Sequence, residues 1–192
     1  MTSTPSQKLE KTAQLSAVDY DPFAGPQIQR VVPTTESQRE VWLASTLSSE
    51  ASLAYNESVT CRFRGALDVE ALRAAVQDVI SRHDALRATI SANGEDLIFA
   101  PDAAIEIPLR RFSGTNNSLH SSAETWLDAA KHAAVNHVFD LENGPLLHVE
   151  IFQLGVNDHA LMFTAHHVIF DGWSAGILVQ EVVILILLIC LH

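Results

Sequence analysis

The residues best suited to chemistry are two adjacent histidines, His166 and His167, followed closely by the pair Asp171-Gly172. They end a nearly continuous apolar run, residues 160–165, which is typical of a strand buried on both faces. Side chains alternate across a strand, so we expect the two histidines to point to opposite faces. One of them can then line a cavity while the other is packed. An imidazole there is suited to general acid–base chemistry near pH 7.

This run has two other interpretations. Two histidines and an aspartate are a plausible ligand set, but neighbouring strand residues on opposite faces cannot easily share one ion, so no metal site is expected. Both histidines could instead be hydrogen-bonded core residues, although the Asp-Gly pair beside them favours a functional site. Downstream, Asp171-Gly172 predicts a turn, and Ser174 is predicted to cap a helix that begins at Ala175.

Composition and charge narrow the classes of function. The 192 residues are 47% hydrophobic and 18% charged, which is typical of a globular domain and sufficient for one buried core. Twelve Lys and Arg against 23 Asp and Glu give a net charge of -11, which disfavours binding to nucleic acid or to anionic lipid. The two cysteines, Cys61 and Cys190, form no paired spacing, and the N-terminus has no apolar signal core. These features predict a protein of the reducing cytoplasm.

Hydrophobic periodicity predicts alternating helices and strands from about residue 35 onwards. Residues 1–30 are polar and interrupted by proline, so we expect a disordered tail or linker there. Cap residues Thr35 and Asp68 open two of the predicted helices, and Asn93-Gly94 turns a predicted hairpin. The expected helices are 35–44, 68–82 and 123–138, the expected strands are 59–64, 86–91, 97–100, 146–154 and 159–165, and loops are expected at 45–57 and 109–118.

This order of elements predicts an α+β sandwich, one lobe in which helices flank a mixed sheet. The C-terminal segment, residues 182–191, is an uninterrupted apolar run without a polar face. It is about half as long as a bilayer span, and Gln180-Glu181 blocks its extension, so stable membrane insertion is not expected. The run is either a buried helix or coding sequence outside its proper frame, and if exposed it would promote aggregation.

Four segments resemble, in the same order, the motifs of the condensation domains of nonribosomal peptide synthetases. These domains belong to the chloramphenicol-acetyltransferase-like superfamily. The segments are Thr35–Leu43, Ser81–Ile90, Phe139–Leu141 with Gly144–Leu147, and His166–Ser174. The resemblance covers about residues 33–181 and implies a chloramphenicol-acetyltransferase-like α/β sandwich. Residues 31–181 would form the N-terminal lobe of a two-lobed domain, with a linker at 1–30 and an atypical apolar tail at 182–192.

The resemblance also implies roles for the motif residues. The family places its catalytic role on the second histidine, here His167, which would orient or deprotonate an amine or stabilise the tetrahedral intermediate. Asp171 would hold the loop through a buried salt bridge to Arg87 or Arg82, and loss of either partner would cost roughly 3–5 kcal/mol. Gly172 would allow close approach of substrate. His166 belongs to the same motif and is expected to pack in the core.

The implied reaction is amide formation between a donor acyl or peptidyl thioester and the amine of an aminoacyl acceptor. Both substrates would be presented on the phosphopantetheine arms of carrier proteins, and the chain itself would bind no cofactor. The implied partners are carrier proteins, other synthetase modules and a separate C-terminal lobe, because the sequence holds one lobe only. Two alternatives stay open: a non-catalytic remnant or carrier-protein-binding fragment, and a stand-alone thioester-dependent acyltransferase.

Overall fold

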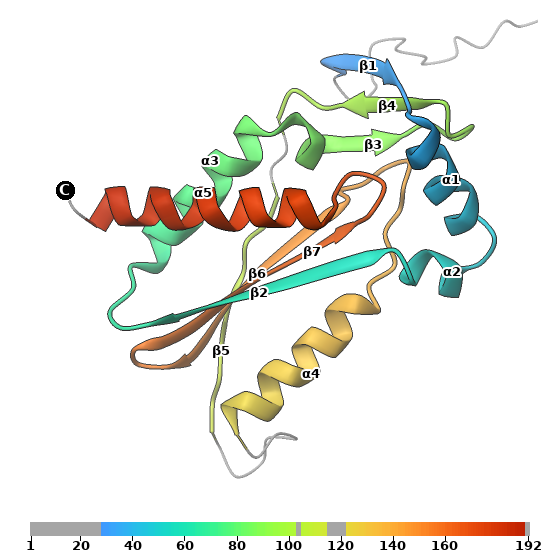
Figure 1. Ribbon diagram of the computed structural model, residues 1–192. Coiled ribbons are helices and arrows are strands. Elements are labelled where there is room, and N and C mark those ends of the chain that lie inside the picture. Colours follow the sequence, from blue (N-terminus) through green and yellow to red (C-terminus); the bar gives the residue numbers. More distant parts are fainter. Residues whose placement is uncertain (1–27, 103–104, 115–121, 191–192) are drawn as a thin grey trace, which may run out of the picture.

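The computed structural model describes residues 28–102, 105–114 and 122–190, and Figure 1 shows how its elements are arranged. Most of the predicted linker therefore lies outside the described residues. The elements are β1 (Arg30–Pro33), α1 (Glu36–Ser45), α2 (Ser49–Leu53), β2 (Asn56–Arg64), α3 (Val69–Arg82), the 3-10 helix η1 (Asp84–Arg87), β3 (Ala88–Ile90), β4 (Asp96–Phe99), β5 (Leu109–Arg111), α4 (Ala123–Val135), β6 (Leu147–Gly155), β7 (Asp158–His166) and α5 (Gly172–Cys190).

The strands form two sheets. The larger has the order β2-β7-β6-β5, and it is antiparallel except for the parallel pair β5 and β6. The smaller has the order β1-β4-β3 and is antiparallel throughout. The α+β class with a mixed sheet is confirmed.

Helices cover both faces of the larger sheet, with α3 and α5 on one side and α4 on the other (Figure 1). Side chains along β7 point alternately to the two faces of the sheet, so they contribute to two separate apolar clusters. Leu161 and Phe163 belong to the cluster that includes α3 and α5, whereas Ala160 and Met162 pack with residues of α4. The continuous apolar run was therefore correctly predicted as a strand buried on both faces.

Local signals determine the starts of two helices, as predicted. Thr35 accepts a hydrogen bond from the backbone of Gln38, whose side chain accepts one from the backbone of Thr35, so α1 begins with a capping box. Asp68 accepts from the backbone N–H groups of Glu70 and Ala71 at the start of α3. These caps depend on residues two or three positions apart, which is why the sequence reveals them.

Other boundaries were predicted wrongly. The expected loop at 45–57 contains α2, capped by Ser48, and the first residues of β2. The expected loop at 109–118 begins with β5, and α4 ends at Val135 rather than at residue 138. In both strands, pairing decided the outcome: β2 extends along the whole of β7, and β5 gains its structure from β6. Such long-range hydrogen bonds leave no local pattern.

The β3–β4 hairpin confirms the turn predicted at Asn93-Gly94. Gly94 has a φ of 72° and lies against Trp42 of α1, so a Cβ built there would be 2.3 Å from the Trp42 ring. Glycine is required at this position for both reasons. The close contact joins the smaller sheet to α1, which forms one wall of the site described below.

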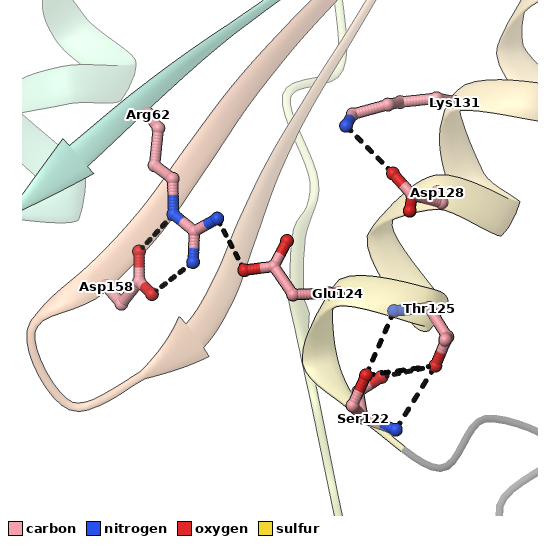
Figure 2. Close-up of polar contacts among 7 residues, drawn as sticks. All are labelled: Arg62, Ser122, Glu124, Thr125, Asp128, Lys131 and Asp158. Carbon is pink, nitrogen blue, oxygen red and sulfur yellow. Dashed lines mark hydrogen bonds and ion pairs between the residues drawn. The ribbon is translucent and has the colours of Figure 1, made fainter.

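Arg62 of β2 fastens α4 to the larger sheet (Figure 2). Its guanidinium makes two hydrogen bonds to Asp158, at 2.8 and 2.5 Å, and an ion pair with Glu124 of α4 at 2.6 Å. The Arg62 contact lowers the pKa of Asp158 below its usual value. This network lies at the opposite end of β7 from His166, so it supports the fold rather than the site.

The apolar C-terminal run continues α5 as far as Cys190. Val182 and Ile186 are buried against the core, whereas Ile184 and Leu187 are 46% and 57% exposed. One side of this apolar run thus packs against the core, and the other side is exposed to solvent. Among the helices of the described part of the chain, none is long and apolar enough to cross a membrane.

Candidate active site

His166 is the last residue of β7 and is completely buried. The backbone N–H of Val168 donates to its Nδ1 (3.3 Å), which leaves Nε2 as the protonated nitrogen. Nε2 lies 3.3 Å from Ser45 Oγ and 3.5 Å from Ser52 Oγ. Burial, with a smaller contribution from His167, lowers the pKa of His166 to about 4. The ring is therefore neutral at pH 7, packs in the core as expected, and has no surface for a substrate.

His167 follows the end of β7, and its backbone N–H donates to the carbonyl oxygen of Tyr55 (2.8 Å). Its side chain is 37% exposed, in contrast to that of its neighbour. Nδ1 is the shielded nitrogen and lies 3.1 Å from Oε1 of Glu57, though outside hydrogen-bond geometry. The Tyr55 ring stacks beside the imidazole at 6.5 Å. The predicted division between one packed and one accessible histidine is confirmed.

A cavity of about 310 Å³ lies in front of His167. Its other walls come from α1 and from the loop between β7 and α5. Gln38 ties these walls together, because its Nε2 donates to the carbonyl oxygen of Val168 (3.1 Å) while its Oε1 accepts from Thr35. The lining residues are Thr35, Ser37, Gln38, Val41, His167, Val168, Ile169, Phe170, Asp171 and Ser174.

Asp171 is exposed and is the N-cap of α5. Its Oδ1 accepts hydrogen bonds from the backbone N–H (2.8 Å) and the Oγ (2.6 Å) of Ser174, and its carbonyl oxygen accepts from Ala175. The prediction that Ser174 caps the helix was therefore wrong. A carboxylate accepts more strongly than a hydroxyl, and it favours the positive end of the helix dipole. The Ser174 hydrogen bonds lower the pKa of Asp171, with a smaller contribution from His167.

The expected buried salt bridge from Asp171 to Arg87 or Arg82 is also wrong for this structure. Arg87 is buried and donates to Asp84 (2.6 Å) and to the backbone carbonyl groups of Ala100 and Pro101. Arg82 forms an exposed ion pair with Glu181 of α5 at 3.2 Å. Both guanidinium groups thus have nearer acceptors, and an exposed Asp171 needs no buried counter-charge.

Gly172 is the first residue of α5, and apart from its chain neighbours and the backbone of its own helix, no heavy atom lies within 4 Å of the position that a Cβ would occupy. Its φ is outside the positive region where glycine is favoured. Neither its backbone nor its described neighbours require glycine, so only approach of a substrate to this surface, as expected from the sequence, would give it a role.

Sequence reasoning missed both Glu57 and the contact that Gln38 makes at the site. Extending the alternation of Val59 and Cys61 back by one step would have placed Glu57 on the same face of the strand. Nothing local links Glu57 to His167, however. Within residues 28–102, 105–114 and 122–190, no three His, Cys, Asp or Glu side chains are grouped so as to hold a metal ion.

Known proteins resemble this chain in sequence over most of its length. Residues 28–186 match the family model described as the condensation domain. The chain is 32% identical over 154 residues to chondramide synthase cmdD of Chondromyces crocatus. It is also 32% identical over 166 residues to isonitrile lipopeptide synthase of Mycobacterium tuberculosis. The alignments include 79% and 84% of this chain but only 4% and 6% of these relatives.

Solved structures support the same fold. The starter condensation domain of the rhizomide synthetase RzmA superposes with a TM-score of 0.70 at 21% identity, over 80% of this chain and 36% of that chain. The complex of the X-domain and OxyB from teicoplanin biosynthesis gives a TM-score of 0.68 at 28% identity, over 83% of this chain and 33% of that chain. The chain therefore spans about a third of the length of these solved chains.

Proposed function

The chain belongs to the condensation-domain family, and we propose that it provides the His167 wall of a site for amide formation. The observation that carries the proposal is the contrast within the histidine pair. His166 is buried and neutral, whereas His167 opens on a cavity of about 310 Å³. One relative is named as a lipopeptide synthase, which favours peptide assembly over a stand-alone acyltransferase.

The chemistry needs one proton acceptor at the right place. The amine nitrogen of an acceptor attacks the carbonyl carbon of a donor thioester, so a C–N bond forms and the C–S bond breaks. His167 takes the proton from the attacking amine and passes it to the departing sulfur. A neutral imidazole near pH 7 is suited to both transfers, and such catalysis is typically worth about 10²–10⁴-fold in rate.

Asp171 and Gly172 support His167 indirectly in this proposal. Asp171 fixes the start of α5 and so holds the loop from Val168 to Phe170, which lines the cavity. Gly172 leaves space beside that cap for substrate to approach. His166 anchors the end of β7 through Ser45 and Ser52, which keeps the backbone of His167 in place.

The substrates would arrive on the phosphopantetheine arms of carrier proteins, and other synthetase modules would load them. Residues 31–181 act as the N-terminal lobe in this scheme, and a C-terminal lobe supplies the facing wall.

The two widely spaced cysteines, with Cys61 a free thiol, suit the reducing cytoplasm.

The test is reconstitution. The chain is combined with the C-terminal lobe of a related condensation domain and with loaded donor and acceptor carrier proteins, and the amide product is measured by mass spectrometry. His167→Ala is expected to slow product formation by at least about 10²-fold. The control is His132→Ala, because His132 is exposed on α4 and does not line the cavity. Equal rates for the His167 variant and the wild type would refute the proposal, and so would a folded reconstituted wild type without product.

A further inference from the structure

Glu57 and His167 are neighbours because of the register between β2 and β7. His167 pairs with Tyr55 through its backbone, one step beyond the last pair of the ladder, Asn56 and His166. Glu57 is therefore the diagonal neighbour of His167 on the same face of the sheet. Long side chains in diagonal positions can meet, and the 3.1 Å separation of Glu57 Oε1 from His167 Nδ1 shows that these do.

The contact constrains which ring nitrogen carries the proton. Nδ1 of His167 is shielded from solvent and faces a carboxylate oxygen. A neutral imidazole has one N–H and one lone pair, and a lone pair directed at a carboxylate would be repelled. The proton therefore belongs on Nδ1, and the lone pair belongs on Nε2. Asp171, the other carboxylate that interacts with His167, already accepts from Ser174.

We propose that Glu57 is a positioning residue that holds His167 in the Nδ1–H tautomer, with Nε2 free to accept a proton from the cavity. The proposal rests on the proposed function for its catalytic meaning, but its structural part stands alone. An oriented base of this kind needs a third group that fixes its tautomer, and alignment commonly tightens when substrate binds. The Tyr55 ring, directly before β2, stacks beside the imidazole.

The neighbouring histidine provides an internal reference. His166 accepts from Val168 at Nδ1 and is therefore held in the opposite tautomer, Nε2–H. Nothing in that arrangement involves Glu57. A change confined to His167 thus reports on the Glu57 contact, whereas a change in both rings reports on damage to the fold.

The tautomers can be measured directly on the 192-residue chain. We expect ¹⁵N–¹H correlation spectra of histidine-labelled protein to show Nδ1–H for His167 and Nε2–H for His166, with the His167 signals assigned by their loss in His167→Gln. In Glu57→Ala the His167 signals are expected to move towards Nε2–H while those of His166 stay in place. Glu57→Gln keeps an acceptor oxygen and should retain the Nδ1–H form. Glu40→Ala, at an exposed position on α1, is the control.

A second measurement separates this inference from the proposed function. In the reconstituted assay, Glu57→Ala is expected to lower kcat by about 10²-fold with little change in KM, because the wrong tautomer removes the base and not the binding surface. An unchanged His167 tautomer and unchanged kcat in Glu57→Ala would overturn the inference even if His167→Ala is inactive. A tautomer that changes as expected, together with an active His167→Ala, would reject the proposed function and leave the positioning contact intact.

Discussion

Asp171 uses one carboxylate oxygen to accept both the backbone N–H and the Oγ–H of Ser174, at 2.8 and 2.6 Å. This pair sets the first turn of α5 and the end of the loop that lines the cavity. The aspartate of the motif is therefore a helix cap in this chain, and it also interacts electrostatically with His167.

Asp171→Ala is expected to reduce the free energy of unfolding by about 1 kcal/mol, the usual cost of losing an N-cap. The folded pKa of Asp171 is lowered, so its contribution is complete above the usual value near 3.8 and is lost as pH falls through the folded pKa. Urea denaturation at pH 7 and pH 3 measures both effects. Asp171→Asn retains an acceptor and should keep most of the stability at pH 7, and an equal loss in both variants would contradict the capping role.

The buried neutral His166 makes the fold sensitive to acid. Its folded pKa of about 4 lies below the unfolded value of 6.5, so the unfolded state binds a proton first as pH falls. Stability should be complete above pH 6.5 and should decline by roughly 2–3 kcal/mol on approach to pH 4. In His166→Gln the decline over that range should be smaller, even if stability at pH 7 is reduced. Parallel curves for the two proteins would show that His166 is not responsible.

Gly94→Ala is expected to destabilise the chain by about 2–4 kcal/mol, because it combines a positive φ with overpacking against Trp42. Gly176→Ala is the matched control. Gly176 is exposed in α5, and an added Cβ would meet no atom within 4 Å beyond its chain neighbours and its own helix backbone, so alanine there should stabilise the helix by about 0.5–1 kcal/mol. Thermal unfolding followed by tryptophan fluorescence reports both. Similar effects of the two substitutions would argue against the Trp42 contact.

Arg87 and Arg82 should differ sharply when replaced by alanine. Loss of the buried Arg87 removes the donor of two backbone carbonyl groups and one of the two arginines that pair with Asp84, the other being Arg30, at a cost of about 3 kcal/mol. Loss of the exposed Arg82 should cost at most about 0.5 kcal/mol. A double-mutant cycle between Arg87 and Asp171 should give no coupling beyond about 0.5 kcal/mol. A coupling energy of several kcal/mol between Arg87 and Asp171 would contradict this pairing and favour the salt bridge expected from the sequence.

The exposed side of α5 should cause the chain to associate. Ile177, Ile184 and Leu187 leave between 46% and 57% of their surfaces in contact with solvent. Replacing Ile184 and Leu187 by lysine is expected to shift the protein towards monomer in sedimentation experiments. Gln180→Lys adds one of these two positive charges at an exposed but polar position, and so shows the effect of added charge without loss of apolar surface. Equal association in all three proteins would place the contact elsewhere.

Much of the fold could be predicted because its signals are local. Thr35 and Asp68 cap helices through neighbours two or three residues away, and Asn93-Gly94 turns between strands that follow each other directly. The alternation at His166 and His167 likewise needs only the geometry of one strand. The strand segments that were missed, β5 and the first residues of β2, are held by strands distant in the chain, whereas α2 was missed although its Ser48 cap is local.

The sequence alone therefore determined the family motifs, the order of the main elements and the division between a packed and an accessible histidine. Only the tertiary structure decided which charged groups meet. Asp171 caps α5 instead of pairing with an arginine, and Glu57 reaches His167 because β2 and β7 share a particular register. Side-chain charges interact over a few ångströms in space, whatever their separation along the chain, so their partners follow from packing and not from spacing.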